Sequence, residues 1–269
     1  MITSSLQNNP IGFFDSGVGG LTILSAFRKV LPNENCIFLG DTKNMPYGEK
    51  TKDQLIEFSS DAFSFFERKG VKAVVMACNT TSAVVYDELK DKYNFKLYPL
   101  IQSVSKLLAN LPVNKIGVFA TPATVNSHAY TKWINKYNSR IDVIEIPCPE
   151  WVKIVENNET ETQNALNSVK EKMEQMLKYN PDKIVLGCTH YPYLTEQLSK
   201  YASKERFINP ANIYAQYIKS DMADSNLLKN FNIIVKDEFY VTANSKKFTN
   251  AGNRFYNVDN VLEVNVNIL

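Results

Sequence analysis

The sequence has no long hydrophobic run, no closely spaced cysteine pair and almost no excess of charge of either sign. Its longest fully apolar run near the middle, residues 73–78, has six residues, whereas a membrane-spanning helix needs about 20. The first ten residues lack the basic and apolar segments of a secretory signal. We therefore expect a cytoplasmic protein with no membrane partner.

The charge balance argues against a nucleic-acid partner. Thirty Lys plus Arg residues oppose 28 Asp plus Glu residues, which leaves a formal net charge of +2. This excess is too small to indicate binding to nucleic acid or to anionic lipid. Hydrophobic residues make up 44% of the 269 positions, enough for one large or two ordinary globular domains. A small-molecule partner fits this composition better.

The cysteines are spread too widely to form a disulfide framework. Cys36, Cys78, Cys148 and Cys188 are separated by 42, 70 and 40 positions, and no C-x-x-C pair is present. We expect free thiols in a reducing compartment. Cys78, Cys188 and His190 form only an incomplete zinc set, so no metal is expected.

Short β-branched and aromatic runs alternate with segments of helical periodicity. Thr51 and Gln54 form a capping-box pattern at the start of a helix that Gly70 ends. Apolar residues between Ala165 and Leu177 recur at three- and four-residue steps, which indicates a helix with a buried face. This alternation predicts an α/β fold with a mostly parallel sheet. Strands are predicted at residues 11–14, 36–40, 73–76, 96–100, 115–119, 143–146 and 183–186, with a possible edge strand at 261–268.

An internal sequence repeat divides the chain into two related halves. The segment IGFFDSGVGG from Ile11 resembles IGVFATPATV from Ile116, an offset of 116 − 11 = 105. The segment VVMACNTTSA around Cys78 resembles IVLGCTHYPY around Cys188, an offset of 188 − 78 = 110. Ligands bind beyond the carboxyl ends of parallel strands, where these motifs lie. Two facing halves would place Cys78 and Cys188 across one cleft.

Two further motifs follow predicted strands and allow either a structural or a functional interpretation. The glycines of DSGVGG at 15–20 permit a tight turn whose N–H groups could hold an anion. This motif lacks the spacing of both common nucleotide-binding loops. In GDTKNMPYG at 40–48, Pro46 and Gly48 could present Tyr47 from a rigid loop or simply form a surface turn.

Paired thiols limit the chemistry that the cleft could perform. A redox-active cysteine pair remains an alternative, because it requires only that the two cysteines reach disulfide geometry. A Cys-His hydrolase would leave the second cysteine without a purpose. Racemisation uses both, because one base removes the α-proton of an amino acid while an acid on the opposite face returns one. The site must then ionise one thiol and keep the other protonated.

Taken in order, the motifs resemble those of the glutamate racemase family, the cofactor-independent enzymes that supply D-glutamate for peptidoglycan synthesis. The resemblance implies two flavodoxin-like, doubly wound parallel-sheet domains related by pseudo-twofold symmetry, with the active site at their interface. We expect one domain at 1–100 plus 210–269, a second at 101–209, and assembly as a homodimer. The resemblance covers nearly the whole chain and rests on DSGVGG at 15, GDTKNMPYG at 40, ACNTTSA at 77, ATPATVNSHAY at 120, LGCTHYP at 186 and FYVTANSKKF at 239.

The same resemblance implies a role for each matching residue. Cys78 would act on D-glutamate and Cys188 on L-glutamate, with Asp15 and His190 assisting the thiols. Glu156 matches the family's acidic position. The implied substrate contacts are Asp15, Ser16, Pro46, Tyr47, Gly48, Asn79, Thr80, Thr121, Thr124, Thr189 and His190.

Alternatives remain at the level of the substrate and of the activity. The motifs contain few Lys or Arg residues to measure the length of a substrate side chain, so aspartate or a hydantoin could replace glutamate. A non-enzymatic amino-acid-binding protein is a further alternative. The chain departs from the family pattern in LIQSVS at 100–105, at His128, and in the tail segment TANS at 242–245.

Overall fold

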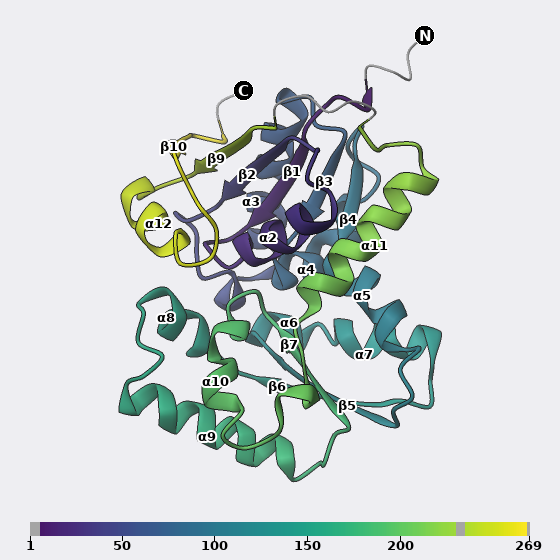
Figure 1. The fold of residues 1–269 in the computed structure, drawn as a ribbon, viewed down its shortest axis with the longest axis vertical. Coiled ribbons are helices and arrows are strands. Elements are labelled where there is room, and N and C mark those ends of the chain that lie inside the picture. The colour runs from purple at the N-terminus through teal and green to yellow at the C-terminus, as the bar shows by residue number, and fades with distance from the viewer. Residues whose placement is uncertain (1–5, 230–234, 268–269) are drawn as a thin grey trace.

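The computed structural model describes residues 6–229 and 235–267, and it contains two parallel β-sheets, each surrounded by helices (Figure 1). Every strand pair in both sheets is parallel. The six-stranded sheet has the order β10 (Leu262–Glu263), β9 (Asp237–Val241), β2 (Cys36–Gly40), β1 (Ile11–Asp15), β3 (Ala73–Met76) and β4 (Lys96–Pro99). The four-stranded sheet has the order β6 (Asp142–Pro147), β5 (Lys115–Ala120), β7 (Lys183–Gly187) and β8 (Phe207–Ile208).

The internal sequence repeat corresponds to equivalent strands in the two sheets. The order β2-β1-β3-β4 in one sheet matches β6-β5-β7-β8 in the other, with β1 and β5 at equivalent central places. This is the strand pattern of flavodoxin-like folds and confirms the predicted fold class. Strands β9 and β10 return from the end of the chain to the first sheet (Figure 1). The proposed domain limits at residues 101 and 210 remain predictions.

Helices connect the strands and cover both sheets. The capping box is present, because Thr51 Oγ1 accepts from Gln54 N and Gln54 Oε1 accepts from Thr51 N. Gly70 follows this helix with a φ of +63°, a conformation that glycine adopts readily. The α-helices are α2 (Leu21–Val30), α3 (Lys52–Arg68), α4 (Asn79–Leu89), α5 (Leu100–Leu108), α6 (Pro122–Asn126), α7 (Ala129–Tyr137), α8 (Trp151–Glu156), α9 (Gln163–Leu177), α10 (Thr195–Leu198), α11 (Pro210–Asp224) and α12 (Ser245–Gly252). Short 3-10 helices are η1 (Tyr47–Glu49), η2 (Tyr191–Leu194) and η3 (Lys204–Arg206).

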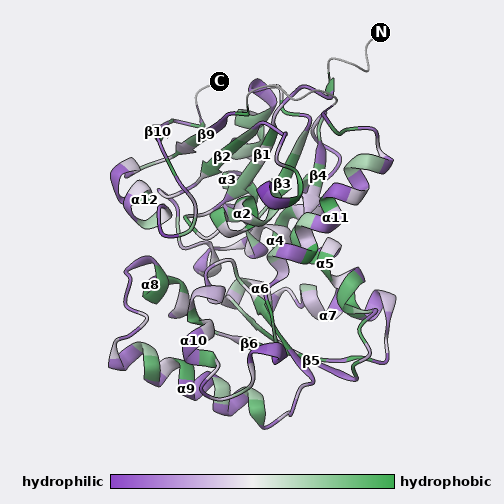
Figure 2. Cartoon of the chain, viewed as in Figure 1, coloured by the Kyte–Doolittle hydropathy of each residue, from purple (hydrophilic) through white to green (hydrophobic). Residues whose placement is uncertain are grey.

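Adjacent residues of the central strands enter different parts of the core. Phe13 and Phe14 of β1 are both fully buried, yet they belong to separate apolar clusters on the two faces of the sheet. Val118 and Phe119 of β5 divide in the same way. Hydrophobic colour accordingly concentrates on the strands and on the inner faces of the helices (Figure 2). One of the clusters includes residues of both sheets, so the two halves share a continuous core.

The main departure from the predicted elements is the tail. The alternation at 261–268 predicts a long edge strand, but β10 covers only Leu262–Glu263, at the edge beside β9. The Asn265 side chain accepts from Asn267 N and closes a turn that ends the strand. Residue 268 lies outside the described residues. Leu100, predicted as the end of a strand, instead begins α5 after Pro99. In the described part of the chain, no helix is long and apolar enough to cross a membrane.

Candidate active site

Cys78 and Cys188 lie at equivalent points of the two sheets and line one cavity. Cys78 follows β3 and immediately precedes α4, and Cys188 directly follows β7. Both thiols are free and almost buried, with 6% and 7% exposure. Because β3 and β7 are the equivalent strands of the two halves, each half supplies one sulfur to a shared space.

The cavity between the thiols is very small. Its volume is about 20 Å³, room for about one water molecule. An amino acid is much larger than this space. The cavity is lined by Ser16, Pro46, Tyr47, Gly48, Cys78, Asn79, Thr80, Thr121, Val152, Cys188, Thr189 and His190. All but Val152 are among the residues that the sequence analysis selected.

Asp41 holds the Tyr47 loop in place and was missed by the sequence analysis. Tyr47 is 1% exposed, and its hydroxyl donates to Asp41 Oδ2 over 2.5 Å. Asp41 also accepts from Asn44 Nδ2 and from Thr242 Oγ1 in the tail. The pKa of Tyr47 is raised well above its usual value, first by burial and then by the charge of Asp41. The tyrosine therefore stays neutral, and the signal that could have revealed Asp41 is its place directly after β2.

Hydroxyl groups from both halves meet at the cavity wall. Thr80 Oγ1 lies 2.9 Å from Thr121 Oγ1, which lies 3.0 Å from Thr124 Oγ1. Thr80 lies in the first turn of α4 in the first half, whereas the other two threonines lie at the start of α6 in the second. Thr124 does not line the cavity and acts from behind Thr121. The cluster links the halves beside the thiols.

A second link runs through Asn79. Its side-chain Oδ1 accepts from the hydroxyl of Tyr130, which is fully buried, over 2.8 Å. This bond turns the amide nitrogen of Asn79 to the other side, where it can donate. Tyr130 was also missed, because nothing in its local sequence indicates a partner 51 positions away.

The Cys78 side of the cavity favours a protonated thiol. Burial, followed by the charge of the nearby Asp15 carboxyl, raises the pKa of Cys78 to about 12. Asp15 lies behind the cavity wall, fully buried, where Oδ1 accepts from Gly17 N and Oδ2 accepts from Thr189 Oγ1. Burial raises the pKa of Asp15 to about 6, although the positive charge of His190 opposes the shift. This side is therefore arranged to hold a proton.

The Cys188 side carries a positive charge instead. His190 Nδ1 lies 3.7 Å from Cys188 Sγ, and His190 Nε2 lies 2.6 Å from Glu156 Oε1. Burial alone would lower the pKa of His190, but hydrogen bonds to Cys188 and Glu156 outweigh it and raise that pKa well above its usual value. The pKa of Glu156 is lowered, because its hydrogen bond to His190 outweighs burial. The imidazolium of His190 therefore lies next to the sulfur of Cys188.

The glycines of DSGVGG allow the second half to approach. A Cβ at Gly19 would lie 2.3 Å from Thr189 Oγ1 and 2.7 Å from His190 Cε1, closer than atoms tolerate. The N–H group of Gly17 binds Asp15, and that of Val18 donates to Glu156 Oε1 over 3.4 Å. These two N–H groups therefore hold carboxylates of the protein itself, in the place where the sequence suggested a ligand anion.

Other singled-out residues lie away from the cavity. His128 is exposed, immediately precedes α7 with a φ of 51° and does not line the cavity. Cys36 and Cys148 are buried and do not line the cavity. Among the described residues, no group of three or more His, Cys, Asp or Glu side chains could hold a metal ion.

Comparisons with known proteins agree with this geometry. The Asp/Glu/Hydantoin racemase family profile matches residues 22–218. The glutamate racemase of Carboxydothermus hydrogenoformans is 37% identical over 262 residues, which cover 96% of this chain and 97% of that protein. The crystal structure of glutamate racemase from Francisella tularensis in complex with D-glutamate has a TM-score of 0.89 at 33% identity, and covers 97% of this chain and 99% of that one. A glutamate racemase of Bacillus anthracis has a TM-score of 0.90 at 28% identity, with 96% and 98% covered.

Proposed function

The chain belongs to the Asp/Glu/hydantoin racemase family, and on this premise we propose that it is a glutamate racemase. The observation that carries the proposal is the pair of thiols at equivalent strand ends, lining one cavity. The relatives that match nearly the whole chain are named glutamate racemases, which favours glutamate among the substrates of the family.

We propose a two-base mechanism that needs no cofactor. With L-glutamate bound, Cys188 as thiolate takes the Cα proton, and the electron pair of the C–H bond passes into the substrate carboxylate. The Cys78 thiol then gives its proton to the opposite face of Cα, which yields D-glutamate. The charges beside each sulfur support these starting states, because His190 is cationic next to Cys188 while Cys78 is held as a thiol. In the reverse direction the two cysteines exchange roles.

Polar groups around the thiols would hold the substrate. Ser16, Asn79, Thr80 and Thr189 provide hydroxyl, amide and backbone donors at the cavity wall, and such donors stabilise charge that develops on a carboxylate. The loop Pro46–Gly48 and Thr121 would complete the enclosure. Asp15, His190, Thr124 and Glu156 would act mainly by setting charge and position around the lining residues.

Isotope exchange tests the chemistry directly. In deuterated water, turnover should place solvent deuterium at Cα of the product enantiomer, and circular dichroism should follow the loss of optical rotation. Cys78→Ala and Cys188→Ala should each abolish racemisation while the fold is retained. Full activity in the double variant would refute the two-thiol mechanism, and binding without any proton exchange would identify an amino-acid-binding protein instead.

Substrate choice within the family needs a separate measurement. The profile that matches this chain also names aspartate and hydantoin racemases, so these are the alternative substrates. We expect kcat/KM for glutamate to exceed that for aspartate by at least tenfold, since an error of one methylene is worth about 10- to 200-fold in an enzyme pocket. The opposite ranking would assign the chain to aspartate.

We further propose that the enzyme is a cytoplasmic homodimer that supplies D-glutamate for peptidoglycan, with domains at 1–100 plus 210–269 and at 101–209. These parts follow from the family resemblance. Sedimentation velocity of the purified chain tests the dimer, and a single species at the mass of 30.6 kDa would reject it.

A further inference from the structure

The catalytic cavity has no positive charge on its Cys78 side. Among the described residues that line it, only His190 can carry a positive charge, and its Nδ1 lies 3.7 Å from Cys188 Sγ. The charged group that acts most strongly on Cys78 is instead the carboxyl of Asp15, which adds to the effect of burial and raises the pKa of the thiol. Yet D-to-L conversion requires Cys78 as a thiolate, because the thiolate is the reactive form of a cysteine. Another kind of group must therefore favour charge on this sulfur.

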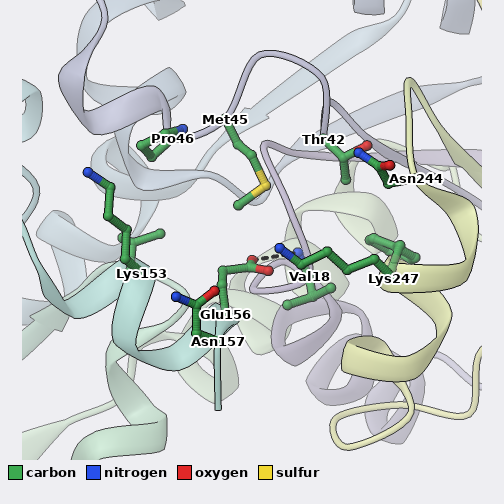
Figure 3. Close-up of a pocket in the computed structure, with 11 residues that line it drawn as sticks. Val18, Thr42, Met45, Pro46, Lys153, Glu156, Asn157, Asn244 and Lys247 are labelled. Carbon is green, nitrogen blue, oxygen red and sulfur yellow. Dashed lines mark hydrogen bonds between the residues drawn. The ribbon is translucent and has the colours of Figure 1, made fainter. Parts of the chain in front are cut away.

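The neighbouring cavity does not provide this charge. It has a volume of about 200 Å³ and shares Pro46 and Val152 with the catalytic cavity. Helices α8 and α12 contribute Lys153 and Lys247 to its wall (Figure 3). Neither lysine lines the catalytic cavity, and neither is among the groups that most affect the pKa of Cys78. Hydrogen-bond donors remain as the groups that can stabilise a thiolate here.

Thr81 provides two such donors. Cys78 is the N-cap residue of α4, and Thr81 lies three residues later, in the first turn. The backbone N–H at this position has no acceptor within the helix and faces the side chain of the N-cap residue. Burial and then Asp15 raise the pKa of Cys78, whereas the hydroxyl and the N–H of Thr81 oppose this shift, because they favour the charged sulfur as hydrogen-bond donors.

No other partner competes for the Thr81 hydroxyl. With Cys78 as a thiol, this oxygen is sealed from solvent and has no well-formed hydrogen bond to any described residue. It does not bond a backbone carbonyl of the preceding turn, as threonine hydroxyls inside helices often do. A neutral thiol is a weak acceptor, but hydrogen bonds to an ionised acceptor are about twice as strong as neutral ones. The hydroxyl is therefore a buried donor whose strong partner exists only when Cys78 is ionised.

The other thiol has no counterpart of Thr81. In the second half, the position three residues after Cys188 is occupied by Tyr191, whose hydroxyl donates to Cys148 O over 2.8 Å. Tyr191 begins the short helix η2, whose N-cap residue is His190 and not the cysteine. A change at Thr81 should therefore affect one thiol and leave the other as it is.

We propose that Thr81 is a positioning residue that acts through Cys78, because its hydroxyl and its N–H donate to the sulfur whenever the sulfur is a thiolate. The inference rests on the proposed racemase function. With D-glutamate bound, the thiolate takes the Cα proton, an S–H bond forms, and the Cα–H electron pair passes into the substrate carboxylate. In the opposite direction the S–H bond breaks, the proton goes to Cα, and the electron pair that stays on the sulfur meets the same two donors.

Racemisation alone does not separate the two thiols. L- and D-glutamate have equal free energies, so kcat/KM must be the same in both directions. Elimination of chloride from 3-chloroglutamate removes this restriction, because it is irreversible and needs only one base. With the D enantiomer, Cys78 takes the Cα proton, the Cα–H electron pair forms a Cα=Cβ bond, and chloride leaves with the electrons of the Cβ–Cl bond. Water hydrolyses the resulting enamine to 2-oxoglutarate and ammonium. Cys188 is the base for the L enantiomer.

Thr81→Val provides the test, because valine keeps the shape of threonine and removes only the hydroxyl. We expect kcat/KM for elimination from 3-chloro-D-glutamate, measured as 2-oxoglutarate formed, to fall about tenfold or more, as expected for the loss of a hydrogen bond to a charged group. The value for the L enantiomer should not change. Thr81→Ser keeps the hydroxyl and should restore most of the activity on the D enantiomer. Thr81→Val should also unfold no more easily than wild type, because the hydroxyl that it removes is unpaired in the thiol state.

Ser59→Ala is the matched control. Ser59 Oγ is also buried without a partner among the described residues, but Ser59 lies in α3 and does not line the catalytic cavity. This variant should eliminate chloride from both enantiomers at the wild-type rate. In Thr81→Val, an equal loss with both enantiomers, a loss with the L enantiomer alone, or no loss would overturn the role of Thr81. Absence of both racemisation and elimination in the wild-type enzyme would instead overturn the proposed function, so the two failures are distinct.

Discussion

At the scale of a single residue, the buried carboxyl of Asp15 lies in the site although it destabilises the folded protein when it is ionised. Its carboxyl is fully buried, and its pKa is raised from 3.8 to about 6, chiefly by burial. The folded state therefore binds this proton more tightly than the unfolded state does. The protonated carboxyl makes its full contribution to the free energy of unfolding below pH 4. This contribution is lost as the pH rises through 6, because the ionised carboxylate is then buried in surroundings that disfavour its charge.

Asp15→Asn should consequently stabilise the protein at pH 7 while it reduces racemisation. A shift of about two pKa units corresponds to about 3 kcal/mol, and the amide keeps an acceptor for Gly17 N. Urea unfolding at pH 4 and at pH 7 measures the effect: the variant should gain stability over wild type only at the higher pH. Equal stability of the variant and the wild-type protein at pH 7 would contradict the destabilisation that we attribute to the ionised Asp15 carboxylate.

Tyr130 is a positioning residue for the amide of Asn79. Tyr130→Phe removes the hydroxyl that fixes Asn79 Oδ1 across the two halves and leaves a buried acceptor unpaired, at a cost of about 1–3 kcal/mol. We expect KM for glutamate to rise several-fold, with a smaller change in kcat, as the amide loses its fixed orientation.

Tyr214→Phe is the control for this substitution. Tyr214 is equally buried, and its hydroxyl donates to Tyr98 O, but it does not line the catalytic cavity. Both variants should lose similar stability in thermal unfolding, and only Tyr130→Phe should change KM. An increase in KM in both would point to a general loosening of the fold.

What the sequence reveals about residues depends on whether their signal is local. The two cysteines could be found because each follows a strand and the motif repeats. Tyr130 and Val152 gain their places through packing between distant segments, and no pattern in the neighbouring sequence encodes such contacts. The hydrogen bonds of Glu156 are likewise a product of tertiary approach.

At the scale of elements, strand positions could be predicted closely because parallel strands buried on both faces are nearly continuous apolar runs. The LIQSVS segment was harder to interpret, since it lacks the family pattern. In the structure it forms most of α5, where Gln102 Nε2 donates to Ser82 O and Ser82 Oγ donates to Gln102 Oε1. The polar residues of this helix thus pair with α4, an arrangement that periodicity alone does not predict.

The loop before α2 offers a test of element packing through two glycines. In Gly19→Ala the new methyl group would meet Thr189 and His190, so we expect the halves to be unable to close and racemisation to fall at least about tenfold, as expected when catalytic groups are displaced by about 1 Å. Circular dichroism should show an intact fold.

Gly70→Ala is the paired control. Gly70 has a φ of +63°, and a methyl group added there would have no atom of the described residues within 4 Å. The substitution should therefore cost about 1 kcal/mol of stability through backbone strain with no loss of kcat/KM. Normal activity in Gly19→Ala would show that the two halves need not approach as closely as this structure has them.

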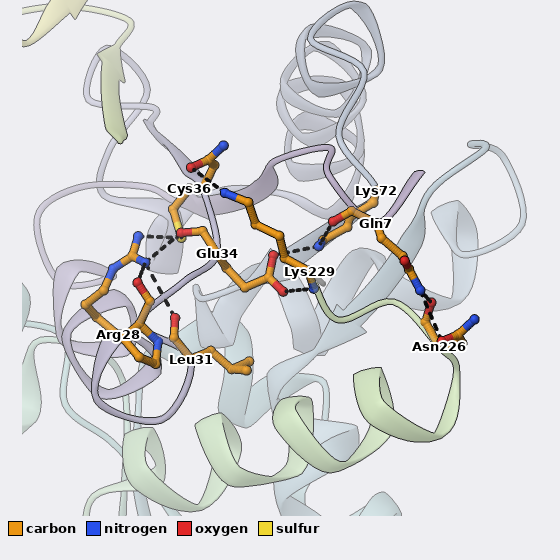
Figure 4. A network of polar contacts seen from close by, with 10 residues as sticks. Gln7, Arg28, Leu31, Glu34, Cys36, Lys72, Asn226 and Lys229 are labelled. Carbon is orange, nitrogen blue, oxygen red and sulfur yellow. Dashed lines mark hydrogen bonds and ion pairs between the residues drawn. The ribbon is translucent and has the colours of Figure 1, made fainter. Parts of the chain in front are cut away.

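At the scale of the whole molecule, a buried polar network joins distant segments of the chain at the amino ends of the strands of the large sheet, opposite the thiols. Lys72, which precedes β3, lies 2.6 Å from Glu34 Oε2 and 2.7 Å from Gln7 O, and the side chains of the ion pair are 0% and 3% exposed (Figure 4). Glu34 Oε1 also accepts from Lys229 N. This network joins the starts of strands to the segment that follows α11, so it anchors the chain where it returns to the first half.

Lys72→Met should unfold the protein more easily without changing the chemistry. The substitution leaves Glu34 buried without its cation, and breaking a buried pair in this way costs about 3–5 kcal/mol. Chemical denaturation should show this loss, while kcat/KM at a temperature where the variant stays folded should match wild type. The double variant Lys72→Met, Glu34→Gln should recover much of the stability, because it removes the stranded charge. A fall in kcat/KM equal to that of a site variant would mean that the two ends of the sheet are coupled and that the anchor also sets the geometry of the thiols.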